Sequence, residues 1–133
     1  MTSEAKLVLL AHGSRDLRWR QTFEALLERA GPDVMLAYLE MCSPTLLRLA
    51  NEVYAAGCRK LVVLPLFLSG GGHVSRDVSR LIREVEMMLD GMEIELLPAI
   101  GEHPQVVEVF LSVIRDACPS EAHTASKTGA EIT

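Results

Sequence analysis

The sequence predicts a three-layer αβα domain built on a four-stranded parallel sheet, with the flavodoxin-like strand order 2-1-3-4 as its simplest layout. Three observations predict this fold class. Apolar segments without polar alternation recur along the chain, as is typical of strands buried on both faces of a parallel sheet. Segments with apolar residues three and four positions apart alternate with them. Such an alternation requires right-handed crossovers, which place helices on both faces of the sheet.

The first two strand and helix pairs occupy residues 6–56. Lys6–Ala11 is an apolar strand, and the apolar stripe of residues 17–30 predicts a helix that ends at the Gly31-Pro32 pair. Residues 34–39 form the second strand. Ser43 and Pro44 are expected to be the N-cap and the first residue of a helix that runs to about residue 56.

The third strand, at residues 61–66, leads into the most distinctive segment of the chain. Three successive glycines follow it, and they permit positive φ angles and close approach of the backbone to a ligand: Gly70, Gly71 and Gly72. Ser75 and Asp77 stand where a helix N-terminus favours a cap and a negative charge. A helix is therefore expected over residues 74–89.

A short strand at residues 94–98 and a helix at residues 105–116 complete the predicted order. Residues 1–117 are therefore expected to form a single domain. Residues 118–133 are polar, small and aperiodic, so they are expected to be a disordered tail in which His123 has no role.

Composition excludes several classes of function. The chain has 133 residues, of which 49% are hydrophobic, enough for one domain with a real core. Neither a membrane-spanning segment nor a signal peptide is indicated, so the cytoplasm is the expected location. A net charge of -5 with few aromatics argues against a nucleic-acid binder. The widely spaced Cys42, Cys58 and Cys118 are interpreted as reduced thiols.

Polar residues cluster where the predicted strands end. His12 follows the first strand, Glu40 ends the second and His73 lies in the loop after the third, while Glu102 and His103 follow the fourth. In an open parallel sheet, ligands bind beyond the carboxyl ends of the strands at the point where the strand order reverses. Any one of these residues could merely cap a helix, and Glu102 with His103 also suits an ordinary helix entry. Their occurrence at one edge favours a functional site.

Two imidazoles and a carboxylate are a suitable ligand set for a first-row divalent ion such as Co²⁺, Ni²⁺ or Fe²⁺. The chain has no HExxH pair and no CxxC pair. His12, His73 and Glu40 would come from separate loops and leave coordination positions open. This predicts a site that hands a metal ion over instead of keeping it.

Arginines surround the predicted edge of an otherwise acidic chain. Three follow the first strand and three lie near the start of the helix after the glycines: Arg15, Arg18, Arg20, Arg76, Arg80 and Arg83. Together with helix N-termini and the glycine amides, they should attract a polyanion. Of the six, Arg18, Arg20 and Arg83 are interpreted as solvated helix residues.

Three segments, LVLLAHGSR at residues 7–15, AYLE…SP at 37–44 and LPLFLSGGGHVSRD at 64–77, resemble the short-form sirohydrochlorin chelatases, which are class II chelatases. The resemblance covers residues 6–117 in order. It implies a lyase-type enzyme, a sirohydrochlorin cobaltochelatase or ferrochelatase, that inserts Co²⁺, Fe²⁺ or Ni²⁺ into the tetrapyrrole. The product would serve cobalamin or siroheme biosynthesis, and no organic cofactor would be required.

The resemblance also implies roles for individual residues. His12 and His73 would be the catalytic, metal-contacting pair, with Glu40 as their acidic partner. The substrate carboxylates would meet polar and glycine residues nearby: Ser14, Arg15, Gly70, Gly71, Gly72 and Arg76. Long members of this family carry two such domains facing one another, so a homodimer that encloses the macrocycle is expected here.

Two other classes of function stay open. A non-catalytic metal or tetrapyrrole carrier would use the same residues without turnover. A flavodoxin-like phosphate or nucleotide module would use the glycines without needing His12 or Glu40. The enzyme is favoured over the nucleotide module because the histidine pair would have no task there. The ligand set does not discriminate among the three metals.

Overall fold

The computed structural model describes residues 4–119 of the chain. Most of the expected tail, including His123, lies outside these residues, as does the side chain of His73. The chain divides into two compact units, Met1–Glu102 and His103–Thr133. The expectation of one domain over residues 1–117 stays a prediction.

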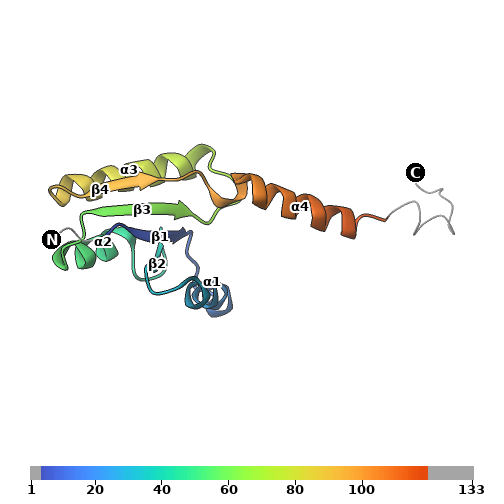
Figure 1. Cartoon of the computed structure of the whole chain (residues 1–133), viewed down its shortest axis with the longest axis horizontal. Coiled ribbons are helices and arrows are strands. Elements are labelled where there is room, and N and C mark those ends of the chain that lie inside the picture. The colour runs from blue at the N-terminus through green and yellow to red at the C-terminus, as the bar shows by residue number, and fades with distance from the viewer. Residues whose placement is uncertain (1–3, 120–133) are drawn as a thin grey trace. The chain divides into compact units, whose positions relative to one another are not determined.

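The first unit contains a four-stranded sheet whose paired strands all run parallel (Figure 1). Its order is β2-β1-β3-β4, which confirms the predicted strand order. The strands are β1 (Lys6–Ala11), β2 (Val34–Tyr38), β3 (Lys60–Pro65) and β4 (Glu93–Leu96). The direction in which successive strands are added to the sheet reverses between β1 and β3, so the topological switch point lies at the carboxyl ends of these two strands.

Side chains on the two faces of the sheet belong to two apolar clusters, because successive strand residues point to opposite sides. Val8 and Leu10 of β1 are completely buried in the cluster that includes α2 (Leu46–Ala55) and α3 (Gly72–Met88). Leu9 and Ala11 belong to the other cluster, against which side chains of α1 (Leu17–Ala30) pack. The sheet therefore has helices on both faces, as predicted.

The start of α2 differs from the prediction. The N-cap is Thr45, whose Oγ1 accepts a hydrogen bond from the Arg48 N–H at 3.3 Å, and not Ser43. Pro44 precedes the helix because its carbonyl accepts a hydrogen bond from the Tyr38 N–H at 2.9 Å. That bond joins Pro44 to the last residue of β2, and the helix begins at Leu46, two residues later than predicted.

The start of α3 also differs from the prediction, by two residues in the other direction. The helix begins at Gly72, and the N-cap is Gly71, which has no side chain to cap it. Ser75 and Asp77 were expected near the cap, but both lie inside the helix, where Asp77 Oδ1 accepts a hydrogen bond from Arg80 Nη2 at 2.6 Å. The expected loop position of His73 is therefore wrong, because residue 73 lies in the first turn of α3.

Smaller differences concern the ends of other elements. A short 3₁₀ helix, η1 (Ile100–Glu102), follows β4 and was not predicted. In the second unit, α4 (Pro104–Ala117) has His103 as its N-cap, with Nδ1 accepting a hydrogen bond from the Gln105 N–H at 3.1 Å. Cys42, Cys58 and Cys118 are free thiols, as predicted. Within residues 4–119, none of the helices is long and apolar enough to cross a bilayer.

Candidate functional site

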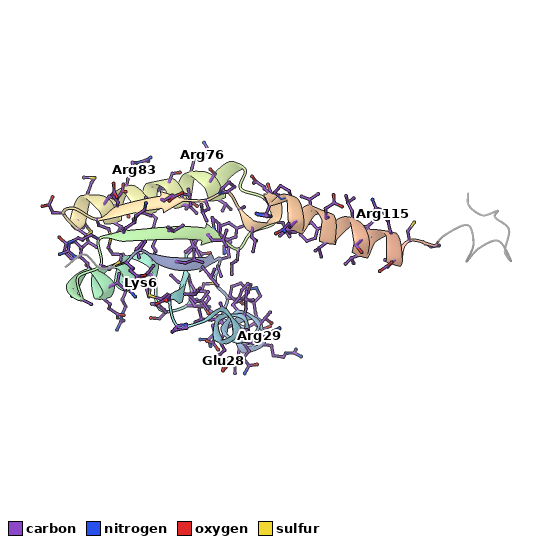
Figure 2. The ribbon with its side chains drawn as sticks, viewed as in Figure 1. Lys6, Glu28, Arg29, Arg76, Arg83 and Arg115 are labelled. Atoms are coloured by element: carbon purple, nitrogen blue, oxygen red, sulfur yellow. The ribbon has the colours of Figure 1, made fainter. Side chains whose placement is uncertain are left out.

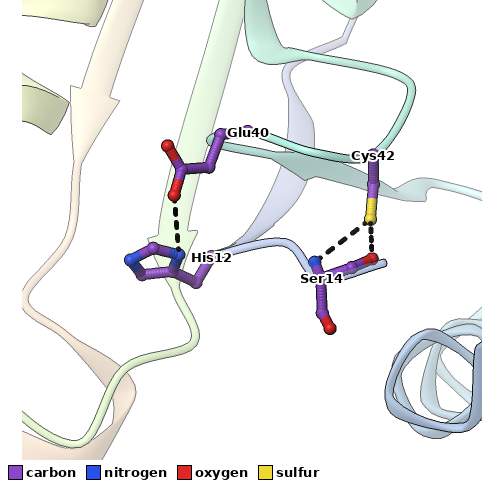
Figure 3. A network of polar contacts seen from close by, with 4 residues as sticks. All are labelled: His12, Ser14, Glu40 and Cys42. Carbon is purple, nitrogen blue, oxygen red and sulfur yellow. Dashed lines mark hydrogen bonds and ion pairs between the residues drawn. The ribbon is translucent and has the colours of Figure 1, made fainter. Parts of the chain in front are cut away.

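His12 and Glu40 meet beyond the carboxyl ends of β1 and β2. Backbone pairing continues past the strands, because the Leu39 N–H donates to the Ala11 carbonyl at 2.9 Å and the Glu40 N–H to the His12 carbonyl at 3.1 Å. The side chains then face one another, with Nδ1 of His12 3.7 Å from Oε2 of Glu40 (Figure 3). The sequence prediction that strand ends bring these two residues together is confirmed.

The separation of this pair suits a shared metal ion. Nitrogen and oxygen donors bind a divalent transition metal at about 2.1 Å, so two donors on one ion are at most about 4.2 Å apart. The 3.7 Å between His12 and Glu40 falls within that limit. Both side chains are about half exposed, at 52% and 55%, so an ion there would keep open coordination positions.

Gly13 allows the loop after β1 to pass close to the loop after β2. Its φ is +113°, and a Cβ at this position would lie 1.7 Å from the Glu40 carbonyl oxygen. Any other residue would therefore push apart the two loops that carry His12 and Glu40. Met41, the next residue after Glu40, also has a positive φ, of 67°.

Cys42 joins the same two loops at a second point, two residues beyond His12 and Glu40. The Ser14 N–H donates to Cys42 Sγ at 3.3 Å, and the thiol donates to the Ser14 carbonyl at 2.8 Å (Figure 3). The Ser14 hydroxyl, a predicted substrate contact, accepts a hydrogen bond from the Asp16 N–H at 3.0 Å. Sequence reasoning missed Cys42, because its partner is a backbone group 28 positions away.

A pocket of about 300 Å³ connects His12 and Glu40 with α3. The α3 residues that line it are Val74, Asp77, Arg80, Leu81 and Glu84. Position 73 is four residues before Asp77 and seven before Arg80, a spacing that puts these backbone positions on one face of a helix. Asp77 and Glu84 were not predicted as site residues, although their spacing of four and eleven residues from His73 places them on the same helix face.

The predicted substrate-binding arginines occupy different surroundings. Arg15 is exposed on the loop after β1. Arg76 and Arg83 project from α3 (Figure 2), where they line a separate hollow of about 360 Å³ together with Arg80. Arg80 lines both this hollow and the His12 pocket, so it connects the two. Arg76 does not line the His12 pocket.

The glycine segment and the weaker candidates also have defined places. Gly71 and Gly72 are exposed, and Gly70 donates its N–H to Glu102 Oε2 at 2.7 Å. A second pocket, of about 210 Å³, lies under this segment and includes both Gly70 and Glu102 among its lining residues. His103 is the cap of α4, which accounts for its position in the sequence.

The described residues provide two adjacent ligands and no complete metal cage. No group of three or more His, Cys, Asp or Glu side chains that could hold a metal ion occurs among them. Tyr38, in the apolar cluster that packs against α1, is 2% exposed, and its hydroxyl has no hydrogen-bond partner in the described part of the chain. Burial is the main cause that raises the Tyr38 pKa, and the charge of Glu24 adds to it. The exposed His12 and Glu40 are therefore the groups suited to exchange ions and protons with a ligand.

Comparisons with known proteins identify related chains. The model of the CbiX family matches residues 6–117. A sirohydrochlorin cobaltochelatase of Saccharolobus islandicus is 29% identical over 119 residues, which is 83% of this chain and 93% of the relative.

Solved structures have the same fold. A putative cobalamin biosynthesis CbiX protein from Marinobacter aquaeolei VT8 superimposes with a TM-score of 0.76 and 33% identity, over 86% of this chain and 94% of that one. The sirohydrochlorin chelatase SirB from Bacillus subtilis subspecies spizizenii, in complex with cobalt, gives a TM-score of 0.73 at 22% identity. This match covers 86% of the present chain but only 51% of the SirB chain.

Proposed function

Because the chain belongs to the CbiX family, we propose that it is a sirohydrochlorin chelatase that inserts Co²⁺, Fe²⁺ or Ni²⁺ into the tetrapyrrole for cobalamin or siroheme biosynthesis. The observation that carries the proposal is the 3.7 Å approach of His12 to Glu40 at the carboxyl edge of the sheet. The relatives named cobaltochelatases support the same reaction. The metal ion is a substrate here, and the chemistry needs no organic cofactor.

Insertion of a divalent ion requires two pyrrole N–H groups to lose their protons while the ion loses its first ligands. The neutral imidazole of His12 can bind the ion or accept a proton, and the Glu40 carboxylate can offset the positive charge. His73, in the first turn of α3, is proposed as the second imidazole of the reaction. Charge balances, because one dication enters as two protons leave.

The substrate carboxylates are proposed to bind around this centre. Arg15 and Arg76 provide charge that is free to reorient, and the amides of Gly71 and Gly72 provide donors near the N-terminus of α3. The Gly70 N–H already donates to Glu102, so Gly70 contributes the close approach of its backbone. Ser14 offers its hydroxyl from the loop after β1. Arg80 joins this set, because it lines the His12 pocket as well as the arginine hollow.

An anaerobic absorbance assay tests the function. Purified protein is mixed with sirohydrochlorin and Co²⁺, Fe²⁺ or Ni²⁺ in turn, beside the His12→Ala, His73→Ala and Glu40→Gln variants. We expect the wild-type protein to complete multiple turnovers faster than the uncatalysed reaction. The rate of metal insertion should fall about a hundredfold in each histidine variant. His103→Asn is the matched control, because asparagine retains a cap for α4.

The outcomes separate the candidate functions. Stoichiometric binding of metal or tetrapyrrole without acceleration would replace the enzyme by a carrier. Full activity in His12→Ala would refute the assigned mechanism.

We further propose that the protein works in the cytoplasm as a homodimer, on small molecules and not on nucleic acid or membranes. The length of SirB supports the dimer, since this chain corresponds to about half of that chain. Two copies of the edge that carries His12 would form the two walls of one tetrapyrrole site.

A further inference from the structure

The loop between β3 and α3 is fastened by η1 at two points. The Gly101 N–H donates to the Phe67 carbonyl at 3.0 Å, near the start of the loop. The Gly70 N–H donates to Glu102 Oε2 at 2.7 Å, near its end. Two consecutive residues of η1 therefore hold both ends of a four-residue stretch that leads directly into α3.

The close fit of η1 to this loop depends on its backbone. Gly101 is buried, and a Cβ there would lie 2.1 Å from the Leu68 carbonyl oxygen. The Glu102 N–H donates to the Ala99 carbonyl at 2.9 Å, which fixes the backbone from which the Glu102 side chain extends. The carboxylate is thus presented to Gly70 from a constrained position.

The Gly70 to Glu102 bond matters because the segment has little else to order it. Glycine loses more backbone entropy on ordering than any other residue, and here three occur in succession. Among the described residues, Glu102 is the one side chain that hydrogen-bonds to Gly70, Gly71 or Gly72. The Gly71 N-cap contributes no side chain to the start of α3. A bond from an amide to a carboxylate is shorter and stronger than one between neutral groups.

We propose that Glu102 is a positioning residue of the chelatase site, and this inference rests on the function proposed above. Its carboxylate fixes Gly70 and thereby the first turn of α3, which contains His73. Val74, in the same turn, lines the pocket that also contains His12 and Glu40. Glu102 therefore acts through the loop and not by contact with the reacting atoms.

Steady-state kinetics of three variants test this role. Glu102→Ala removes the acceptor, whereas Glu102→Gln keeps an oxygen that can accept from the Gly70 N–H. Glu86→Ala is the matched control, because Glu86 Oε2 accepts from the Ile94 N–H at 3.0 Å, near the start of β4 at the amino edge of the sheet. It removes the same kind of bond, a carboxylate to a backbone amide, far from the site.

We expect Glu102→Ala to lower kcat about tenfold, as is typical of residues that orient a functional group without contacting the substrate. Glu102→Gln should recover most of this loss. Glu86→Ala should keep the wild-type kcat even if it lowers the melting temperature as much as Glu102→Ala does. Wild-type kcat in Glu102→Ala would overturn the proposal.

Amide hydrogen exchange in the free protein gives a readout that does not need activity. We expect residues 67–72 to exchange about tenfold faster in Glu102→Ala, and at the wild-type rate in Glu86→Ala. Unchanged exchange in this segment would refute the positioning role. If the wild-type protein gives no turnover, the proposed function fails, and the exchange rates alone still decide whether Glu102 fixes the loop.

Discussion

At the scale of single residues, Gly13 determines whether His12 and Glu40 can meet. Gly13 and Gly31 have similar φ angles, +113° and +110°, but a Cβ on Gly13 would meet the Glu40 carbonyl whereas nothing lies within 4 Å of one on Gly31. Alanine at either position carries the cost of a positive φ, and at Gly13 it also carries a steric clash. We expect Gly13→Ala to lose about 2 kcal/mol more unfolding free energy in urea than Gly31→Ala.

The same pair of variants reports on the site. Gly13→Ala should also lose chelatase activity, since the Glu40 backbone must move to make room, whereas Gly31→Ala should keep it. Equal losses of stability and activity in the two variants would show that the φ angle, and not the contact with Glu40, limits residue 13.

Tyr38 predicts an alkaline dependence of stability. Burial raises the pKa of its phenol above 10.0, so the folded state holds the proton more tightly than the unfolded state does. The contribution of this pKa shift to the unfolding free energy is complete below about pH 10, and it is lost as the pH rises through the folded-state pKa. Tyr38→Phe removes this titration and a buried hydroxyl without a described partner.

Urea denaturation at neutral and alkaline pH measures both effects. We expect Tyr38→Phe to raise the unfolding free energy by about 1 kcal/mol at pH 7 and to flatten its decline above about pH 10. Lower stability of Tyr38→Phe at pH 7 would indicate that the hydroxyl has a partner in solution.

At the scale of elements, α3 presents two different faces to ligands. Asp77 and Glu84 line the His12 pocket, whereas Arg76 and Arg83 line the neighbouring arginine hollow, and Arg80 belongs to both. One helix therefore borders the place for a cation and the place for an anion. This arrangement suits a reaction that brings a metal ion to a polycarboxylate.

The arginine face of α3 leads to a prediction about substrate affinity. Combined Arg76→Ala and Arg80→Ala should raise the KM for sirohydrochlorin about fivefold, because each exposed charge contributes about 0.5 kcal/mol. The KM should also depend less on salt. Arg29→Ala, in the last turn of α1 and so at the amino edge, removes one charge away from the site. An equal rise in KM per charge in that control would show that only net charge matters.

The elements also show how far the sequence predicts the structure. Apolar runs predicted β1, β2 and β3, whereas β4 is short, alternates with glutamates and is mostly exposed. The strand order was predictable because a parallel sheet with crossover helices allows few arrangements. Helix starts were predicted less well. Thr45 caps α2 after Pro44 pairs with the backbone of Tyr38, a contact that Ser43 does not reveal. α3 begins after Gly71 without any side-chain cap, so Ser75 gave no guide to its start. The 3₁₀ helix of three residues is too short to show a periodic pattern.

The same limit applies to the site. His12 and Glu40 were predictable because each directly follows a buried strand. The contacts from Cys42 to Ser14 and from Glu102 to Gly70 join positions 28 and 32 residues apart through backbone groups. Backbone groups are common to all residues, so sequence alone carries no signal for these two contacts.

At the scale of the whole molecule, the exposure of the site argues for a second copy. His12 and Glu40 are about half exposed, and their pocket, about 300 Å³, is at the lower limit for small-molecule sites. A flat macrocycle on this edge would leave one face in water.

A homodimer makes activity depend on protein concentration. If two copies enclose one tetrapyrrole, sedimentation should give twice the mass of one chain at micromolar concentration. Specific activity should then fall on dilution, once the monomer dominates, and at each dilution it should follow the dimer fraction. A linked dimer, with two copies joined by a flexible Gly/Ser linker, is the control, because linkage keeps the partner at millimolar effective concentration. Monomers with full activity at micromolar concentration would contradict the prediction. An equal loss of activity on dilution of the linked dimer would also contradict it, because dilution would then lower activity by a route other than dissociation.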